Sequence, residues 1–279
     1  GFNINTRLSD DALHTAVETG HIGIISFLVL AGADLDKKNS IHMTPLMIAV
    51  SNMNADAVHA LLSHGANPDT ADMYGQRAID YIAQRPKNKN SLEIARALVK
   101  AGADISMSPN YSMTRAPIHA AIASGNDELA ELLLKQKGML ELKEYEDGFT
   151  PFLMAVAAGN KPLTEKILKM GANASARDKH GKNALHVALE NGNLLLLKTL
   201  SKKLKLDVNE KDERGKNLFL RAISIGTSAA IQTVSKIKDI DKTAKDNDGN
   251  TALHIACDFD SRSIFDVVLT ELDSVPLHD

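Results

Sequence analysis

The chain has 279 residues, 44% of them hydrophobic and 24% charged, which is long enough for one or two globular units with a true interior. Its 32 Lys and Arg residues against 35 Asp and Glu residues give a net charge of −3, which argues against nucleic acid or anionic lipid as a partner. The single cysteine and the lack of an apolar run near the roughly 20 residues of a membrane span indicate an intracellular protein with no span and no internal disulfide.

One pattern recurs along the chain in eight copies. It starts as DDALHTAVETGH at Asp10 and returns as HMTPLMIAVSNMN, GQRAIDYIAQR, RAPIHAAIASGN, GFTPFLMAVAAGN, GKNALHVALENGN, GKNLFLRAISIGT and GNTALHIACDF. A large apolar residue marks the same place in every copy: Leu13, Leu46, Ile79, Ile118, Phe152, Leu185, Phe219 and Leu253. The markers are separated by 33, 33, 39, 34, 33, 34 and 34 residues. A period of this size indicates a solenoid of stacked units.

The residue types within each copy predict a helix, a tight turn, a second helix and an extended loop that we call the finger. A small residue usually follows the marker by three positions, as Ala16 and Ala49 do, and allows neighbouring helices to approach closely. Gly-His or Gly-Asn then ends the first helix, because glycine tolerates the left-handed conformation of a helix end. A second apolar-periodic segment leads to exits such as GADLD and GANPD.

This order resembles the ankyrin repeat, which combines a Gly-x-Thr-Pro-Leu-His-x-Ala start, a Gly-His or Gly-Asn turn and a Gly-Ala-Asp-x-Asn exit. The resemblance implies an all-α repeat solenoid, in which helix-turn-helix pairs with β-hairpin fingers form a slightly curved stack. It implies a single domain over residues 1–279. We place the repeats at about 9–38, 39–71, 72–110, 111–144, 145–177, 178–211, 212–245 and 246–273.

Some copies depart from the family pattern. Ser9, His42 and Thr114 stand where the finger usually has glycine, so we expect distorted or wider turns there, and Ile82 takes the small-residue place of the third copy. His254 and Cys257 are three residues apart on one helix face, yet His254 is equivalent to His14, His119 and His186, which the resemblance implies hydrogen-bond one finger to the next. Cys257 falls at a small apolar position, so we expect it to be buried and without chemistry.

Nothing in the chain has the pattern of a catalytic or metal site. Phosphate-binding loops, His-Glu-x-x-His and nucleophile elbows do not occur in the sequence. Acidic neighbours such as Glu144 and Glu146 are typical of solvated loops. We therefore expect no enzyme activity, no cofactor and no metal. Two insertions, AQRPKNKNSLE and SMSPNYSMTRA, are expected to project as loops that enlarge the binding face.

In the ankyrin family, variable finger tips and exposed ends of first helices form the usual recognition surface. By that correspondence we expect a partner's apolar anchor and acidic segment to meet the following finger residues: Ile41, Met43, Met73, Tyr74, Met113, Arg115, Phe149, Lys179, Lys182, Arg214 and Lys216. The helix-end positions are Asn52, Arg85, Ser124, Ala158, Asn191, Ile225 and Phe259. The alternative is that the methionines pack finger against finger and the lysines form an ordinary solvated surface.

The leading interpretation is a monomeric protein-interaction module that acts as an adaptor or scaffold. A second interpretation is a targeting or regulatory arm of a larger enzyme or secreted effector, delivered in that case into a host cell. It is favoured by GFNINTR, which is similar to the exit of a preceding repeat, and by VVLTELDSVPLHD, which lacks the usual exit. The fold alone does not choose between them.

Overall fold

The computed structural model describes residues 7–106, 115–259 and 261–273, with side chains from residue 12 onward. These ranges contain sixteen α-helices and one short 3-10 helix, η1 (Met139–Glu141), and no strand. The chain divides into two compact units, Gly1–Met139 and Leu140–Asp279. A single domain over the whole chain stays a prediction.

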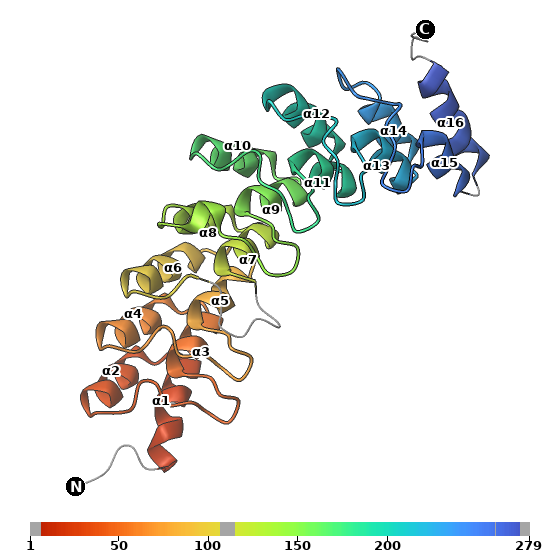
Figure 1. The fold of residues 1–279 in the computed structure, drawn as a ribbon. Helices are drawn as coiled ribbons and strands as arrows, with labels where there is room; N and C mark the ends of the chain where they lie inside the picture. The colour runs from red at the N-terminus through yellow and green to blue at the C-terminus, as the bar shows by residue number, and fades with distance from the viewer. Residues whose placement is uncertain (1–6, 107–114, 260, 274–279) are drawn as a thin grey trace. The chain divides into compact units, whose positions relative to one another are not determined.

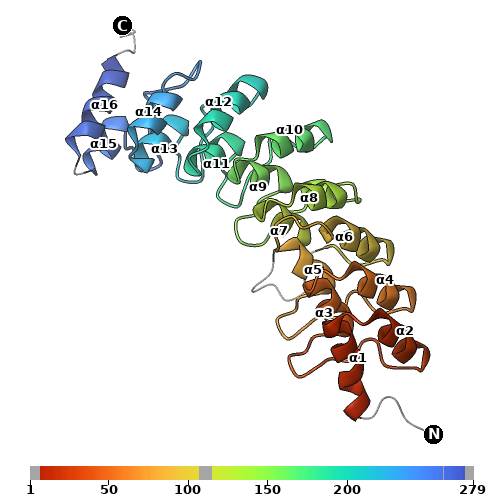
Figure 2. The same cartoon turned by 180° about the vertical axis from the view of Figure 1, so that it is seen from behind.

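The first unit is built from four helix pairs. Their helices are α1 (Arg7–Thr19), α2 (Ile22–Leu30), α3 (Pro45–Ser51), α4 (Ala55–Ser63), α5 (Ala78–Ala83), α6 (Ser91–Lys100), α7 (Pro117–Ala123) and α8 (Asp127–Leu134). First helices contact one another in the order α1, α3, α5, α7, and second helices in the order α2, α4, α6, α8. Figure 1 shows these two rows, with the fingers projecting beside the first helices, and Figure 2 shows them from behind.

The second unit repeats the arrangement with four more pairs. They are α9 (Pro151–Ala157), α10 (Lys161–Lys169), α11 (Ala184–Glu190), α12 (Leu194–Lys203), α13 (Leu218–Ile225), α14 (Ser228–Val234), α15 (Ala252–Cys257) and α16 (Arg262–Asp273). The first helices α9, α11, α13 and α15 again contact one another in sequence order. The predicted all-α ankyrin-type stack of helix pairs is confirmed.

The core of each unit lies between the two rows and is formed by the marker residues and their neighbours. Seven markers, from Leu13 to Phe219, are at most 2% exposed. Polar residues just before the helices cap them: Thr150 Oγ1 accepts the backbone N–H of Leu153 (3.3 Å). Gly159 shows why the turn needs glycine, since its φ is 68° and an added Cβ would lie 2.6 Å from the Asn193 side chain.

The fingers are closed by a side chain that binds the backbone of its own turn. Asp178 Oδ1 accepts the backbone N–H groups of His180 (2.8 Å) and Lys182 (2.9 Å). Asn39, Asp72, Asp212 and Asp246 accept the equivalent pair of N–H groups in their fingers. Glu144, which we expected in a solvated loop, is 3% exposed and accepts three backbone N–H groups. That expectation was wrong because the carboxylate is this finger's anchor.

The finger of the second copy keeps its shape without glycine. His42 adopts the left-handed conformation with φ 61°, close to the 77° of Gly75 in the next finger. The bond from the Asn39 N–H to the Met43 carbonyl oxygen is 3.0 Å, as in the equivalent Asp72 to Gln76 bond of 2.9 Å. The expected distortion at His42 is therefore absent, and the strain falls on one residue's backbone. Ser9 and Thr114 lie where side chains or backbone are not described.

A buried ion pair holds the start of α5. Arg77 and Asp80 are 2% and 1% exposed, and Asp80 Oδ2 accepts both the Arg77 backbone N–H (2.9 Å) and its Nε (3.0 Å). The guanidinium also donates to the Ser106 carbonyl oxygen (2.7 Å) and lies 3.2 Å from Asp104 Oδ2. The third copy thus uses a charged pair where the fifth uses Thr150 and Leu153.

The face of α15 that is turned away from α13 is open. Cys257 and His254 are exposed and Leu253 is partly exposed, whereas the equivalent Val17, Val50 and Val156 are fully buried. The prediction of a buried Cys257 was wrong, because the burying element in the other copies is the next first helix. His14 does bond the next finger, through Nε2 to the Met43 carbonyl oxygen (3.2 Å). His254 instead contacts Thr251 Oγ1 (2.7 Å).

Candidate functional site: exposed finger tips and a groove beneath the last fingers

In the first unit, the predicted apolar finger residues are exposed in two successive fingers. Ile41 and Met73 are each 58% exposed and Tyr74 is 55% exposed, although side chains of this kind normally gain free energy from burial. Met43, at the base of its finger, is only partly exposed, while Arg115 is exposed. Met113 lies outside the described residues.

In the second unit, most of the predicted residues already have contacts inside the protein. Phe149 is partly buried, and Lys179 donates through Nζ to the Glu146 carbonyl oxygen of the preceding finger. Lys182 Nζ is 2.8 Å from Glu190 Oε2, and Lys216 Nζ donates to Ser224 Oγ (2.9 Å). The alternative of an ordinary solvated surface therefore does not describe Lys182, which has a fixed internal role.

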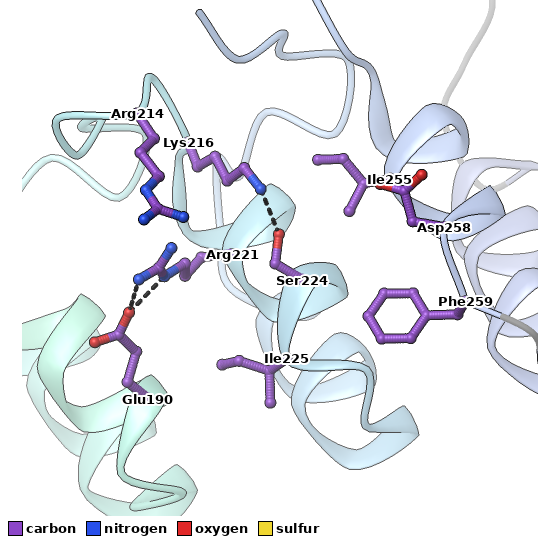
Figure 3. A pocket seen from close by; sticks show the side chains of 9 residues that line it. All are labelled: Glu190, Arg214, Lys216, Arg221, Ser224, Ile225, Ile255, Asp258 and Phe259. Atoms are coloured by element: carbon purple, nitrogen blue, oxygen red, sulfur yellow. Dashed lines mark hydrogen bonds and ion pairs between the residues drawn. The ribbon is translucent and has the colours of Figure 1, made fainter. Parts of the chain in front are cut away.

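A groove of about 470 Å³ lies under the last fingers of the second unit (Figure 3). It is lined by Glu190, Arg214, Lys216, Arg221, Ser224, Ile225, Ile255, Asp258 and Phe259. The first helices contribute equivalent positions from successive copies, since Glu190, Ser224 and Asp258 each follow their marker by five residues. The repeat geometry therefore forms the groove, and the side chain that each copy has at this position determines the chemistry of its lining.

Glu190 is the centre of a charge network at one end of the groove. It accepts Lys182 Nζ on one oxygen and Arg221 Nε (2.5 Å) on the other, and Arg221 also approaches Asp212 Oδ2 (3.6 Å). Burial alone would raise the pKa of Glu190, but the hydrogen bonds and charges of Lys182 and Arg221 outweigh it and hold the pKa below the ordinary glutamate value. Glu190 is thus ionised at neutral pH and already neutralises two cations.

Arg214 and Lys216 also line the groove but are not part of the Glu190 charge network. Both project from the finger of the seventh copy toward the groove, and Figure 3 shows the Arg214 guanidinium beside that of Arg221. Within the described ranges neither head group forms an ion pair within 4 Å, although both residues line a hollow that Asp246 and Asp258 also line. Arg214 also lines two adjoining hollows beneath the same fingers. This end of the groove offers unused hydrogen-bond donors.

The other end of the groove is apolar. Ile225 and Phe259 line this end, whereas Figure 3 shows Ile255 beside Asp258, on the side of Lys216. The ring lies against Gly226, where an added Cβ would come within 2.4 Å of Phe259 Cε1. Gly226 has φ 72° and ends α13 in the left-handed conformation. The glycine thereby provides both the helix end and the space for the ring.

The sequence predicted some of these residues and missed others. Ile225 and Phe259 were expected as helix-end positions and Arg214 and Lys216 as finger positions, and the structure brings all four to one groove. Glu190, Arg221 and Ile255 were missed. Arg221 did carry a signal, because it follows its marker by two residues, where the other copies have the uncharged residues Thr15, Ile48, Tyr81, Ala120, Met154, Val187 and Ile255.

The groove and the rows of helix pairs define the class of protein. A stack of two-helix units with projecting fingers is a repeat protein of the solenoid class. The family model for ankyrin repeats matches residues 13–109 and 118–212, which together exceed half of the chain. The chain belongs to the ankyrin repeat family, whose repeats are protein-binding modules.

The chain is similar to parts of two larger proteins. The chain is 30% identical over 202 residues to the B-cell lymphoma 3 protein homolog of Mus musculus, a match covering 70% of this chain and 45% of that protein. It is 34% identical over 202 residues to the phosphocholine transferase AnkX of Legionella pneumophila, covering 72% of this chain and 18% of that protein. The chain thus spans less than half of either relative.

A solved structure has the same fold. The ankyrin repeat domain of Bcl-3, described as a unique member of the IkappaB protein family, superposes with a TM-score of 0.59 over 92% of this chain and 97% of that one, at 24% identity. Within the described ranges, no helix is long and apolar enough to cross a bilayer. Nor do three or more His, Cys, Asp or Glu side chains gather there as metal ligands would.

Proposed function

We propose that this chain is an adaptor or scaffold that binds another protein through its fingers and first helices, without catalysis. The observation that carries the proposal is the exposure of Ile41, Met73 and Tyr74 on successive fingers. Exposed Met and aromatic side chains gathered on one surface are typical of interfaces. Burial of each of these side chains by a partner is worth about 1 to 3 kcal/mol.

The test is affinity capture from cell lysate with a matched pair of variants. One variant carries Ile41→Ser, Met73→Ser and Tyr74→Ser on the fingers. The control carries Phe27→Ser, Leu30→Ser and Leu195→Ser, which remove still more exposed apolar side chains from the second helices α2 and α12. We expect a protein that the parent and the control retain and the finger variant loses. Loss from the control alone would contradict the proposed surface.

A second candidate function is a regulatory or targeting arm of a larger protein, including one with its own enzyme domain. The match to a phosphocholine transferase, in which the related stretch is only 18% of the protein, favours it. An immunoblot of the source cells with an antibody against this chain tests it. A band far above the 30.1 kDa of this chain would support the arm, and a band at that mass would count against it.

A further inference from the structure

The groove under the last fingers has the two ends that a short linear segment of a partner requires. Pockets that hold ligand groups are typically 300 to 1,000 Å³ in volume and combine apolar walls with a few polar groups. This groove, of about 470 Å³, has Arg214 and Lys216 at one end and Phe259 at the other. The side chains that line the groove therefore indicate what kind of segment fits.

The positive end favours a carboxylate. Arg221 is held by Glu190 through Nε and by Asp212, so its guanidinium is already matched. Arg214 has no partner among the described side chains, and Lys216 uses one of its three N–H donors on Ser224. A guanidinium presents paired donors that match both oxygens of a carboxylate, which adds direction as well as attraction. An acidic side chain thus completes this end.

The apolar end determines the second group that the segment must carry. Ile225 and Phe259, both partly exposed, offer an apolar wall that an aliphatic or aromatic side chain can cover. Asp258 is exposed beside Ile255 and lines an adjoining hollow together with Arg214 and Lys216. Figure 3 shows Arg214 and Lys216 away from the Ile225 and Phe259 end, so an acidic group placed at that end would lack their charge and the two groups of the segment do not exchange places.

We infer that the groove binds an extended peptide segment of the partner in which an Asp or Glu residue, held by Arg214 and Lys216, precedes or follows a large apolar residue on Phe259 by a few positions. The inference rests on the proposed function and names the partner's chemistry at this site. From the sequence we expected the apolar anchor of the partner to meet finger residues such as Tyr74. In this inference the apolar residue of the segment contacts Phe259, which lies in the same unit as Arg214 and Lys216.

A peptide-display experiment tests the inference directly. The parent chain is used to select from a library of random ten-residue peptides, and enriched peptides are resynthesised with a fluorescent label for measurement of Kd. We expect enrichment of peptides with an acidic residue near a Leu, Ile, Phe or Tyr. The double variant Arg214→Gln, Lys216→Gln should weaken their binding at least tenfold. The control double variant Lys202→Gln, Lys236→Gln removes two exposed lysines outside the groove and should leave Kd within twofold.

Two further variants keep the test sharp. In a fresh selection Arg214→Glu should exchange the preferred acidic residue for Lys or Arg, and Phe259→Ala, checked by melting, should abolish the apolar preference alone. Peptides without acidic preference, peptides indifferent to the Arg214 and Lys216 variant, or no enriched peptide at all would overturn the inference. Such a result would not decide the proposed function, which the capture experiment with the finger variants tests separately.

Discussion

The buried pair Arg77 and Asp80 gives the strongest prediction about stability. Replacement of Asp80 by Leu leaves a guanidinium that is 3% exposed without its main partner. The remaining acid, Asp104, is 52% exposed and 3.2 Å away, so it compensates only in part. Loss of one member of a buried pair typically costs about 3 to 5 kcal/mol. We expect Asp80→Leu to lower the free energy of unfolding by about that amount.

The repeat itself supplies the control. The double variant Arg77→Thr, Asp80→Leu reproduces the Thr150 and Leu153 arrangement, in which the hydroxyl caps the helix at 3.3 Å. It removes both charges and should recover most of the stability, because replacing a buried pair by apolar and capping groups is often neutral.

The assay is urea unfolding followed by circular dichroism for the parent, both single variants and the double variant. A double-mutant cycle then gives the coupling between the two side chains, which we expect to exceed about 2 kcal/mol. Equal stability of Asp80→Leu and the double variant would show that the guanidinium is not held as described, and would refute the reasoning.

Three other predictions concern a turn, a histidine and the cysteine. His42→Gly should raise the free energy of unfolding by about 0.5 to 1 kcal/mol in urea melts, because it relieves the left-handed strain and costs some chain entropy; a destabilised variant would contradict this. Burial lowers the pKa of His186, although the charges of Asp212 and Glu190 oppose the shift. The stability that the neutral imidazole contributes is therefore complete above about pH 6.5 and is lost as pH falls through the lowered pKa. His186→Leu should flatten the pH dependence of the melting temperature between about pH 7.5 and 5, and an equal slope in both proteins would argue against this. Cys257 should react with Ellman's reagent in the folded protein at a rate near that of a free thiol, whereas protection until urea is added would restore the buried alternative.

The sequence predicted the features that depend on local periodicity. The markers, the glycine turns and the helix pairs follow from residue types repeated every 33 or 34 positions, and residues such as Leu46 and Phe152 are buried as that spacing requires. Exposure at the fingers was harder to predict, because it differs between positions of one finger. Ile41 and Tyr74, five residues before their markers, are exposed, whereas Met43 and Phe149, three residues before theirs, are partly buried.

Contacts between distant positions account for the rest of the site. Arg221 and Glu190 are 31 residues apart, and nothing local in either copy requires the other. The environment of Cys257 depends on whether another first helix packs beside α15, which its own copy does not specify. Arg77 and Asp80, by contrast, are three residues apart, but their pattern is absent from the other copies and predicts no role by itself.

The most direct test of the central claim is hydrogen-deuterium exchange of this chain with and without the captured partner. The account predicts slower exchange in the fingers around residues 41 and 73–74, or in the finger at residues 213–216 together with the end of α13, and unchanged exchange in the second helices α2 and α12. Protection confined to the second helices would contradict binding through the fingers and first helices.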